Sequence, residues 1–176
     1  MIATLFLVLL LAAATGFDFA SGRIPNRVTL TGAAAGVGLA LLPGGIGIGE
    51  AAGGLGVGLA MFLPTYFFRG MGAGDVKLMA AAGAFLGPSG ALVAALYAYV
   101  LGGLLTVAYA WRARALTRLF LNLRLFAYAS AARIAGGSAP SADDLPLTQL
   151  RAPYALAIAA GVLLQVVTRQ IGALGA

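Results

Sequence analysis

The sequence contains no cysteine and no histidine, and charged residues make up only 9% of its 176 residues. The absence of both residue types excludes thiol nucleophiles, imidazole bases, disulfides and the usual zinc sites. Soluble domains carry roughly 25% charged residues, whereas 61% of this chain is hydrophobic and its mean hydropathy is +0.99. The composition therefore excludes an ordinary soluble globular domain and predicts a membrane protein.

Six apolar stretches, separated by Gly, Pro and charged residues, predict an all-α polytopic membrane protein with about six transmembrane helices in a single domain, 1–176. They cover residues 2–17, 28–42, 51–68, 76–86, 91–111 and 152–168. The first stretch also has the small residues of a signal-peptide cleavage site. Its arginines follow the apolar run instead of preceding it, which favours a first transmembrane helix.

Residues 112–151 differ from the rest of the chain because they contain six arginines and a polar segment rich in Gly, Ser and Pro. Two interpretations stay open for this basic loop. It is either a helix that lies on the membrane surface and is attracted to anionic lipid, or a solvated loop without a role of its own.

The positive charges predict the topology. If the loops after the first, third and fifth spans lie on one side, that side holds ten of the eleven Lys and Arg residues and the other side only Arg169. These loops are therefore predicted to face the cytoplasm, and both termini to face out. Because the charge bias reports topology, the net charge of +6 does not indicate nucleic-acid binding.

Acidic residues are scarce, and two of the five lie at membrane edges that the predicted topology places on the cytoplasmic side. Asp18 ends the first span, and Asp75 opens the fourth span after a run of small residues, which places both on the cytoplasmic side. A carboxylate at such a position is a functional-site candidate. Two carboxylates that meet share a proton and can act on water as base and acid, as in aspartic proteases, without a metal or cofactor.

Simpler interpretations of the same residues stay open. Asp75 can serve as a cap for a helix that starts at Val76. Lys77 is a counter-charge to Asp75, a phospholipid contact or a snorkelling side chain. Glu50, at the edge of the third span, is assigned no chemistry.

Three sequence blocks resemble those of one family. Gly72-Ala73-Gly74-Asp75 matches the GxGD signature of intramembrane aspartyl proteases, and its extension to Ala84 resembles the GxGDxKLxAAxG block of type IV prepilin peptidases. The segment from Asp18 to Ile24-Pro25-Asn26 resembles a second block of that family. Residues 153–158 and Gly161 resemble the block in its last helix.

This resemblance implies a GxGD aspartyl protease-like fold and a membrane endopeptidase. Such enzymes remove the short basic leader from type IV prepilins or pseudopilin precursors at the cytoplasmic face of the bacterial inner membrane, which would leave both termini in the periplasm. Asp18 and Asp75 would be the catalytic pair, and Gly72 and Gly74 would shape the active-site turn. Lys77, Pro25 and Asn26 would bind substrate or shape the site; no metal or cofactor is expected.

The chain departs from the family pattern in two ways. Many members carry an N-terminal domain with CxxC motifs linked to N-methylation, whereas this chain starts at the first span and lacks Cys. It resembles the short, peptidase-only form of tight-adherence (Flp-type) pilus systems, so no methyltransferase activity is expected. Ala20 also replaces a second acid, which we interpret as dispensable.

Three other functions stay open on the sequence alone. One is a preflagellin-type peptidase of the same superfamily. The second is a component of a proton-coupled transporter that uses the two aspartates as a relay. The third is an assembly scaffold without catalytic activity.

Overall fold

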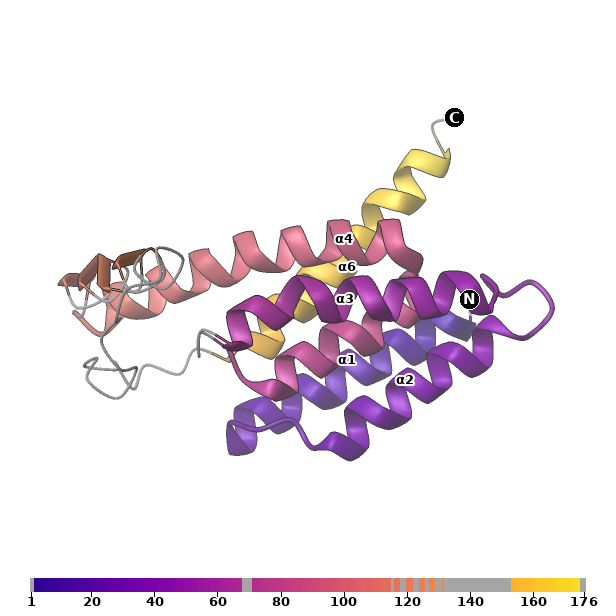
Figure 1. Ribbon diagram of the computed structural model, residues 1–176, viewed down its shortest axis with the longest axis horizontal. Coiled ribbons are helices and arrows are strands. Elements are labelled where there is room, and N and C mark those ends of the chain that lie inside the picture. Colours follow the sequence, from indigo (N-terminus) through magenta and orange to yellow (C-terminus); the bar gives the residue numbers. More distant parts are fainter. Residues whose placement is uncertain are drawn as a thin grey trace. The chain divides into compact units, whose positions relative to one another are not determined.

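The computed structural model consists of α-helices, which confirms the predicted all-α class. It describes residues 2–67, 71–114 and 153–174, and within the basic loop only residues 116–117, 120–121, 124–125, 127–128 and 131. The helices are α1 (Ile2–Ser21), α2 (Asn26–Ala40), α3 (Ile48–Phe67), α4 (Ala73–Arg112) and α6 (Tyr154–Leu174) (Figure 1). Most of the predicted surface helix and linker of residues 112–151 lies outside the described residues.

The chain divides into two compact units. One comprises residues 1–102 and 153–176, and the other residues 103–152. The candidate site and all the packing described below lie within the first unit. In the second unit, α4 ends at Arg112, and Arg114 adopts a positive φ of 51° directly after it.

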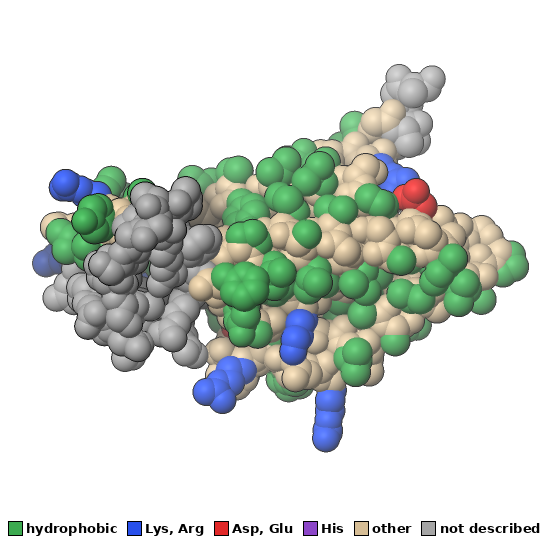
Figure 2. Space-filling model, in the orientation of Figure 1, with side chains coloured by type: hydrophobic (Ala, Val, Ile, Leu, Met, Phe, Trp, Pro, Cys, Tyr) green, Lys and Arg blue, Asp and Glu red, His purple; other side chains and the backbone are tan. Residues whose placement is uncertain are grey.

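Within the described part of the chain, four helices are long and apolar enough to cross a membrane: α1, α3, α4 and residues 154–172 of α6. Their flanks expose large hydrophobic side chains such as Leu5, Phe67 and Leu96, and hydrophobic atoms cover much of the face drawn in Figure 2. Such flanks are suited to lipid rather than to water. The number differs from the six predicted spans because α2 has only 15 residues and because α4 is counted once although it consists of two helical halves joined at Gly87.

Helix α4 reverses its direction at Gly87, whose φ of 74° and ψ of 174° are not helical. A Cβ atom on Gly83 would lie 3.3 Å from the Cβ of Ala91, although eight residues of straight helix extend over about 12 Å. The chain therefore folds back on itself, as Figure 1 also shows. The sequence predicted a turn at residues 87–90 between two spans, and the break is confined to Gly87.

The first half of α4, residues 73–86, forms the buried centre of this unit. Its fully buried side chains are mostly alanines together with Leu78 and Met79. The neighbouring helices approach its backbone through glycines, since a Cβ on Gly54 of α3 would overlap the Gly83 carbonyl oxygen, and one on Gly36 of α2 would lie 2.9 Å from the Ala84 Cβ. Small residues of this kind let membrane helices pack closely.

The remaining helices surround this centre. Helix α1 packs on α2 and α6, and α2 packs on α3. The second half of α4 contacts α3, where the Tyr99 ring stacks on Phe62 with centroids 4.9 Å apart. It also contacts α6, because a Cβ on Gly161 would lie 2.9 Å from the Ala94 carbonyl oxygen.

We expect Gly54→Ala to destabilise the protein by about 1–3 kcal/mol, because the added methyl group meets backbone that no rotamer change can move. Gly56→Ala, two residues away on the same helix, is the matched control, since a Cβ there has nothing within 4 Å. Thermal unfolding of both variants in detergent tests this. Equal melting temperatures for the two variants would contradict the close crossing of α3 and α4.

Candidate active site

Asp18 lies in the last turn of α1, and its carboxylate reaches the first turn of α6. The backbone N–H of Ala155 donates a hydrogen bond of 3.2 Å to Asp18 Oδ2. The first N–H groups of a helix lack partners within the helix and favour a negative charge. Asp18 therefore joins the carboxyl end of α1 to the amino end of α6.

The chain leaves α1 in a tight, well-defined turn. Gly22 has a φ of 63°, and its N–H donates to the Asp18 carbonyl oxygen at 2.8 Å. A glycine in this left-handed conformation commonly ends a helix. Pro25 follows with a ψ of 138° and precedes α2, so the predicted break at Pro25 is confirmed.

Asp75 lies in the first turn of α4, three residues after Gly72, which directly precedes the helix. Its Oδ2 accepts a hydrogen bond of 3.1 Å from the Gly72 N–H, and the Asp75 N–H donates to the Gly72 carbonyl oxygen at 3.1 Å. An acidic side chain that reaches back to the N-cap residue stabilises the start of a helix. Asp75 is therefore not the residue that precedes a helix starting at Val76, as predicted; it is the third residue of a helix that begins at Ala73, and its side chain caps the helix start from there.

The structure brings Asp18 and Asp75 together from different helices. Both carboxyl groups are partly buried, and they are close enough for their charges to interact. Tyr154, the first residue of α6, also interacts electrostatically with Asp75. The three helix ends that carry these groups converge at one end of the bundle.

The predicted site residues Gly74, Asn26 and Lys77 make contacts between the segment that follows α1 and the start of α4. Ile24 is buried, with 8% of its surface exposed, and a Cβ on Gly74 would lie 3.1 Å from the Ile24 Cβ. Lys77 Nζ donates a hydrogen bond of 2.9 Å to Asn26 Oδ1. The segment around Pro25 is therefore fastened to the start of α4 at two points.

The sequence left three interpretations of Lys77 open, and none of them named the partner that the structure shows. The lysine is exposed and hydrogen-bonded to Asn26 in the first turn of α2. No group of three or more His, Cys, Asp or Glu side chains that could bind a metal occurs among the described residues. The ionisable groups that these helix ends bring near one another are two carboxyl groups, a type of side chain that can take up and release protons.

Sequence reasoning did not assign the start of α6 to the site. The residues Pro153, Tyr154 and Ala155 stood only in a block that resembled a family motif, and the Ala155 N–H is a backbone group with no signature of its own. The usable signal was Pro153, since proline is common at the first positions of a helix and so predicts where free N–H groups are presented.

A comparison with models of protein families finds a match to the type IV leader peptidase family over residues 5–107. This region is more than half of the chain and includes both aspartates. The chain belongs to the type IV leader peptidase family. Comparisons with the curated proteins and with the solved structures found no significant match.

Membership of this family implies a protease that processes prepilin-type substrates. The resemblance that the sequence blocks suggested is thereby confirmed at the level of the family. The matched region contains α1, α2, α3 and the part of α4 up to residue 107. It ends before α6, whose Ala155 N–H holds Asp18 in the structure.

We expect Asp18→Ala to be less stable than Asp18→Asn by about 1 kcal/mol, because the asparagine amide oxygen can still accept the Ala155 N–H whereas alanine cannot. Both variants remove the same negative charge beside Asp75, so their difference isolates the hydrogen bond to α6. Thermal or denaturant unfolding in detergent measures it. Equal stability of the two variants would show that Asp18 does not support α6.

We expect Lys77→Met and Asn26→Ala to be non-additive, with a coupling energy of roughly 0.5–1 kcal/mol, because each removes the same exposed hydrogen bond. The double variant should be scarcely less stable than either single variant. Arg27→Met is the control, since Arg27 follows Asn26 directly. A coupling energy near zero in unfolding measurements would contradict the tether.

Proposed function

We propose that this protein is an aspartyl endopeptidase of the bacterial inner membrane that removes the short basic leader from type IV prepilins or pilin-like precursors. The observation that carries this proposal is the convergence of Asp18 and Asp75 at one end of a bundle of apolar helices. Family membership supports the substrate class, and the chemistry of a carboxylate pair supports hydrolysis of a peptide bond.

In the proposed mechanism, the ionised carboxylate takes a proton from a water molecule as this water attacks the scissile carbonyl carbon. The protonated carboxyl group polarises the carbonyl oxygen and then helps to protonate the leaving amine. The hydrogen bonds from Ala155 and Gly72 both end on an Oδ2 atom. They orient the carboxyl groups, and the Oδ1 atoms are proposed to face the water and the peptide.

The residues around the pair have positioning roles in this proposal. Gly72 presents its N–H to Asp75, and Gly74 lets Ile24 lie against the start of α4. Pro25 ends the turn that follows α1, and the Lys77–Asn26 hydrogen bond fastens α2 to α4. Together these contacts would keep the ends of α1 and α4 in register, which proton transfer between two carboxyl groups and one water requires.

The proposed topology has six crossings with the site at the cytoplasmic face. The reversal at Gly87 supports counting α4 twice, and α2, with 15 residues, extends over about 22 Å and would cross where its neighbours thin the bilayer. Arg23 follows the end of α1, Arg27 lies in the first turn of α2 and Lys77 lies near the start of α4, as the positive-inside rule expects for a cytoplasmic end.

Among the alternatives, a preflagellin-type peptidase would use the same chemistry and differ in its substrate. A proton relay in a transporter fits the positions of the aspartates less well. Such relays usually run through the middle of the membrane, whereas both carboxylates lie in terminal turns of their helices. A non-catalytic scaffold would tolerate neutralisation of either aspartate.

The decisive experiment co-expresses the protein with candidate prepilins and follows leader removal by gel shift and mass spectrometry. We expect cleavage by the wild type and a loss of at least about a thousandfold in rate for Asp18→Asn and for Asp75→Asn, because each removes one of two groups that act as a unit. Glu50→Gln is the matched control, since it neutralises a carboxylate on a different helix end.

Two results would contradict the proposal. Cleavage by either asparagine variant at the wild-type rate would rule out a mechanism that needs both carboxyl groups. Membrane-inserted and folded wild-type protein that cleaves none of the candidate prepilins would favour the transporter or scaffold function, which proton-flux measurements then distinguish.

A further inference from the structure

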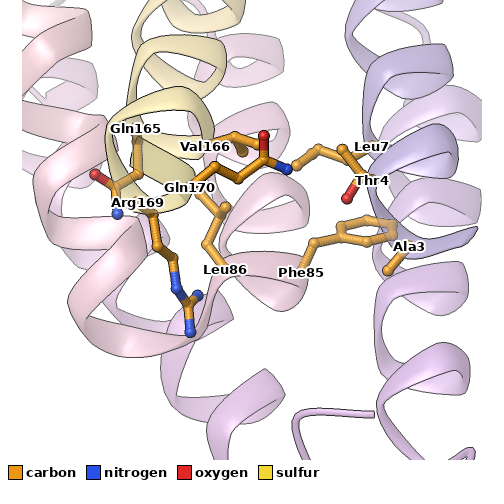
Figure 3. Close-up of a pocket in the computed structure, with 9 residues that line it drawn as sticks. All are labelled: Ala3, Thr4, Leu7, Phe85, Leu86, Gln165, Val166, Arg169 and Gln170. Atoms are coloured by element: carbon orange, nitrogen blue, oxygen red, sulfur yellow. The ribbon is translucent and has the colours of Figure 1, made fainter. Parts of the chain in front are cut away.

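A pocket of about 160 Å³ lies between the start of α1, the end of the first half of α4 and the last turns of α6 (Figure 3). One wall is apolar and formed by large side chains from all three helices: Leu7, Phe85, Leu86 and Val166. The helix flanks next to it are also apolar and exposed, since Leu5 is 59% and Val167 is 49% exposed. The pocket therefore adjoins surface that the bilayer would cover.

The polar part of the lining carries one positive charge. It is formed by Thr4, Gln165, Arg169 and Gln170. Gln165 and Arg169 also line an adjoining pocket of about 360 Å³, together with Ser89 and Thr168. In Figure 3, Gln170 extends from α6 toward Thr4 and Leu7, and Arg169 extends beside Leu86. The structure gives Arg169 no hydrogen-bond or ion-pair partner among the residues it describes.

This pocket lies at the other end of the helices that carry the aspartates. Asp75 opens the first half of α4 and Leu86 ends it, a rise of about 16 Å; Ala155 and Arg169 are separated by about 21 Å of α6. Arg169 is thus far from the end where Asp18 meets α6. It is also the one Lys or Arg residue that the predicted topology places on this side.

Glu50, at the start of α3, is an acidic residue among those described that lies at this end of the bundle. A Cβ on Gly87 would lie 2.9 Å from Glu50 Oε2, so this carboxylate lies against the beginning of the second half of α4, where free N–H groups favour a negative charge. Glu50 does not line either pocket. The charge presented to the pocket is that of Arg169.

We propose that this pocket binds a phospholipid, with its phosphate at Arg169 and one acyl chain along the apolar wall. A guanidinium group pairs well with phosphate oxygens, and Gln165, which lines both pockets together with Arg169, supplies further N–H donors. Free phosphate would make no favourable contact with the four large apolar side chains, whereas an acyl chain would. The lining therefore favours a lipid over free phosphate. This site is independent of the proposed peptidase activity.

Native mass spectrometry of the detergent-solubilised protein, titrated with phosphatidylglycerol, tests the proposal. We expect the wild type to retain one lipid, and Arg169→Gln to bind it about tenfold more weakly through loss of a charge-assisted hydrogen bond. Arg169→Lys should bind nearly as well as the wild type. Arg27→Gln removes an exposed arginine from the first turn of α2 and should bind as the wild type does.

Two outcomes would overturn the proposal. One is equal lipid retention by the wild type and Arg169→Gln, with Arg169→Gln shown to be folded by its melting temperature. The other is competition by the free headgroup glycerophosphoglycerol at the concentration at which the lipid itself binds, because this would assign the pocket to a soluble phosphate. The lipid titration does not depend on leader cleavage. Its result can therefore be interpreted even if the protein proves not to be a peptidase.

Discussion

The close approach of helix backbones around the first half of α4 is the constraint on which this structure depends. In lipid, apolar side chains gain little by leaving one hydrocarbon environment for another, so helices associate through close packing. Here α2 and α3 meet the buried segment through Gly36, Gly54 and Gly58, and α4 itself supplies Gly83 and a run of alanines. Many large side chains, such as Leu5, Phe67 and Leu96, are left to face outward, where they suit the bilayer.

This packing determines where the polar groups can be. A buried helix that begins at Ala73 presents Asp75 in its first turn, at the end of the bundle instead of its middle. The ends of α1 and α6 reach the same place, where the Ala155 N–H and the Asp18 carboxylate satisfy each other. Two carboxyl groups are thus held near one another at one end of the bundle, each oriented by a backbone N–H.

The same three helices define the other end of the unit differently. At the cleft between α1, α4 and α6, Arg169 is surrounded by neutral polar side chains and an apolar wall. The two ends therefore differ in the groups that lie between the helices: Asp18 and Asp75 at one end, and Arg169, with Glu50 on the neighbouring helix α3, at the other. An asymmetry of this kind suits a protein whose two membrane faces meet different molecules.

The sequence alone determined the helical class, the approximate helix positions, the family and the identity of the two aspartates as candidates. These follow from local properties: apolar length, glycine and proline positions, the scarcity of acids and short motifs around Asp18 and Asp75. Residue contacts between distant segments have no such local signal. Only the tertiary structure joins Asp18 to the Ala155 N–H, Lys77 to Asn26 and Ile24 to Gly74, because a backbone N–H looks the same at every position of a sequence, and which side chain reaches it is decided by how the helices pack.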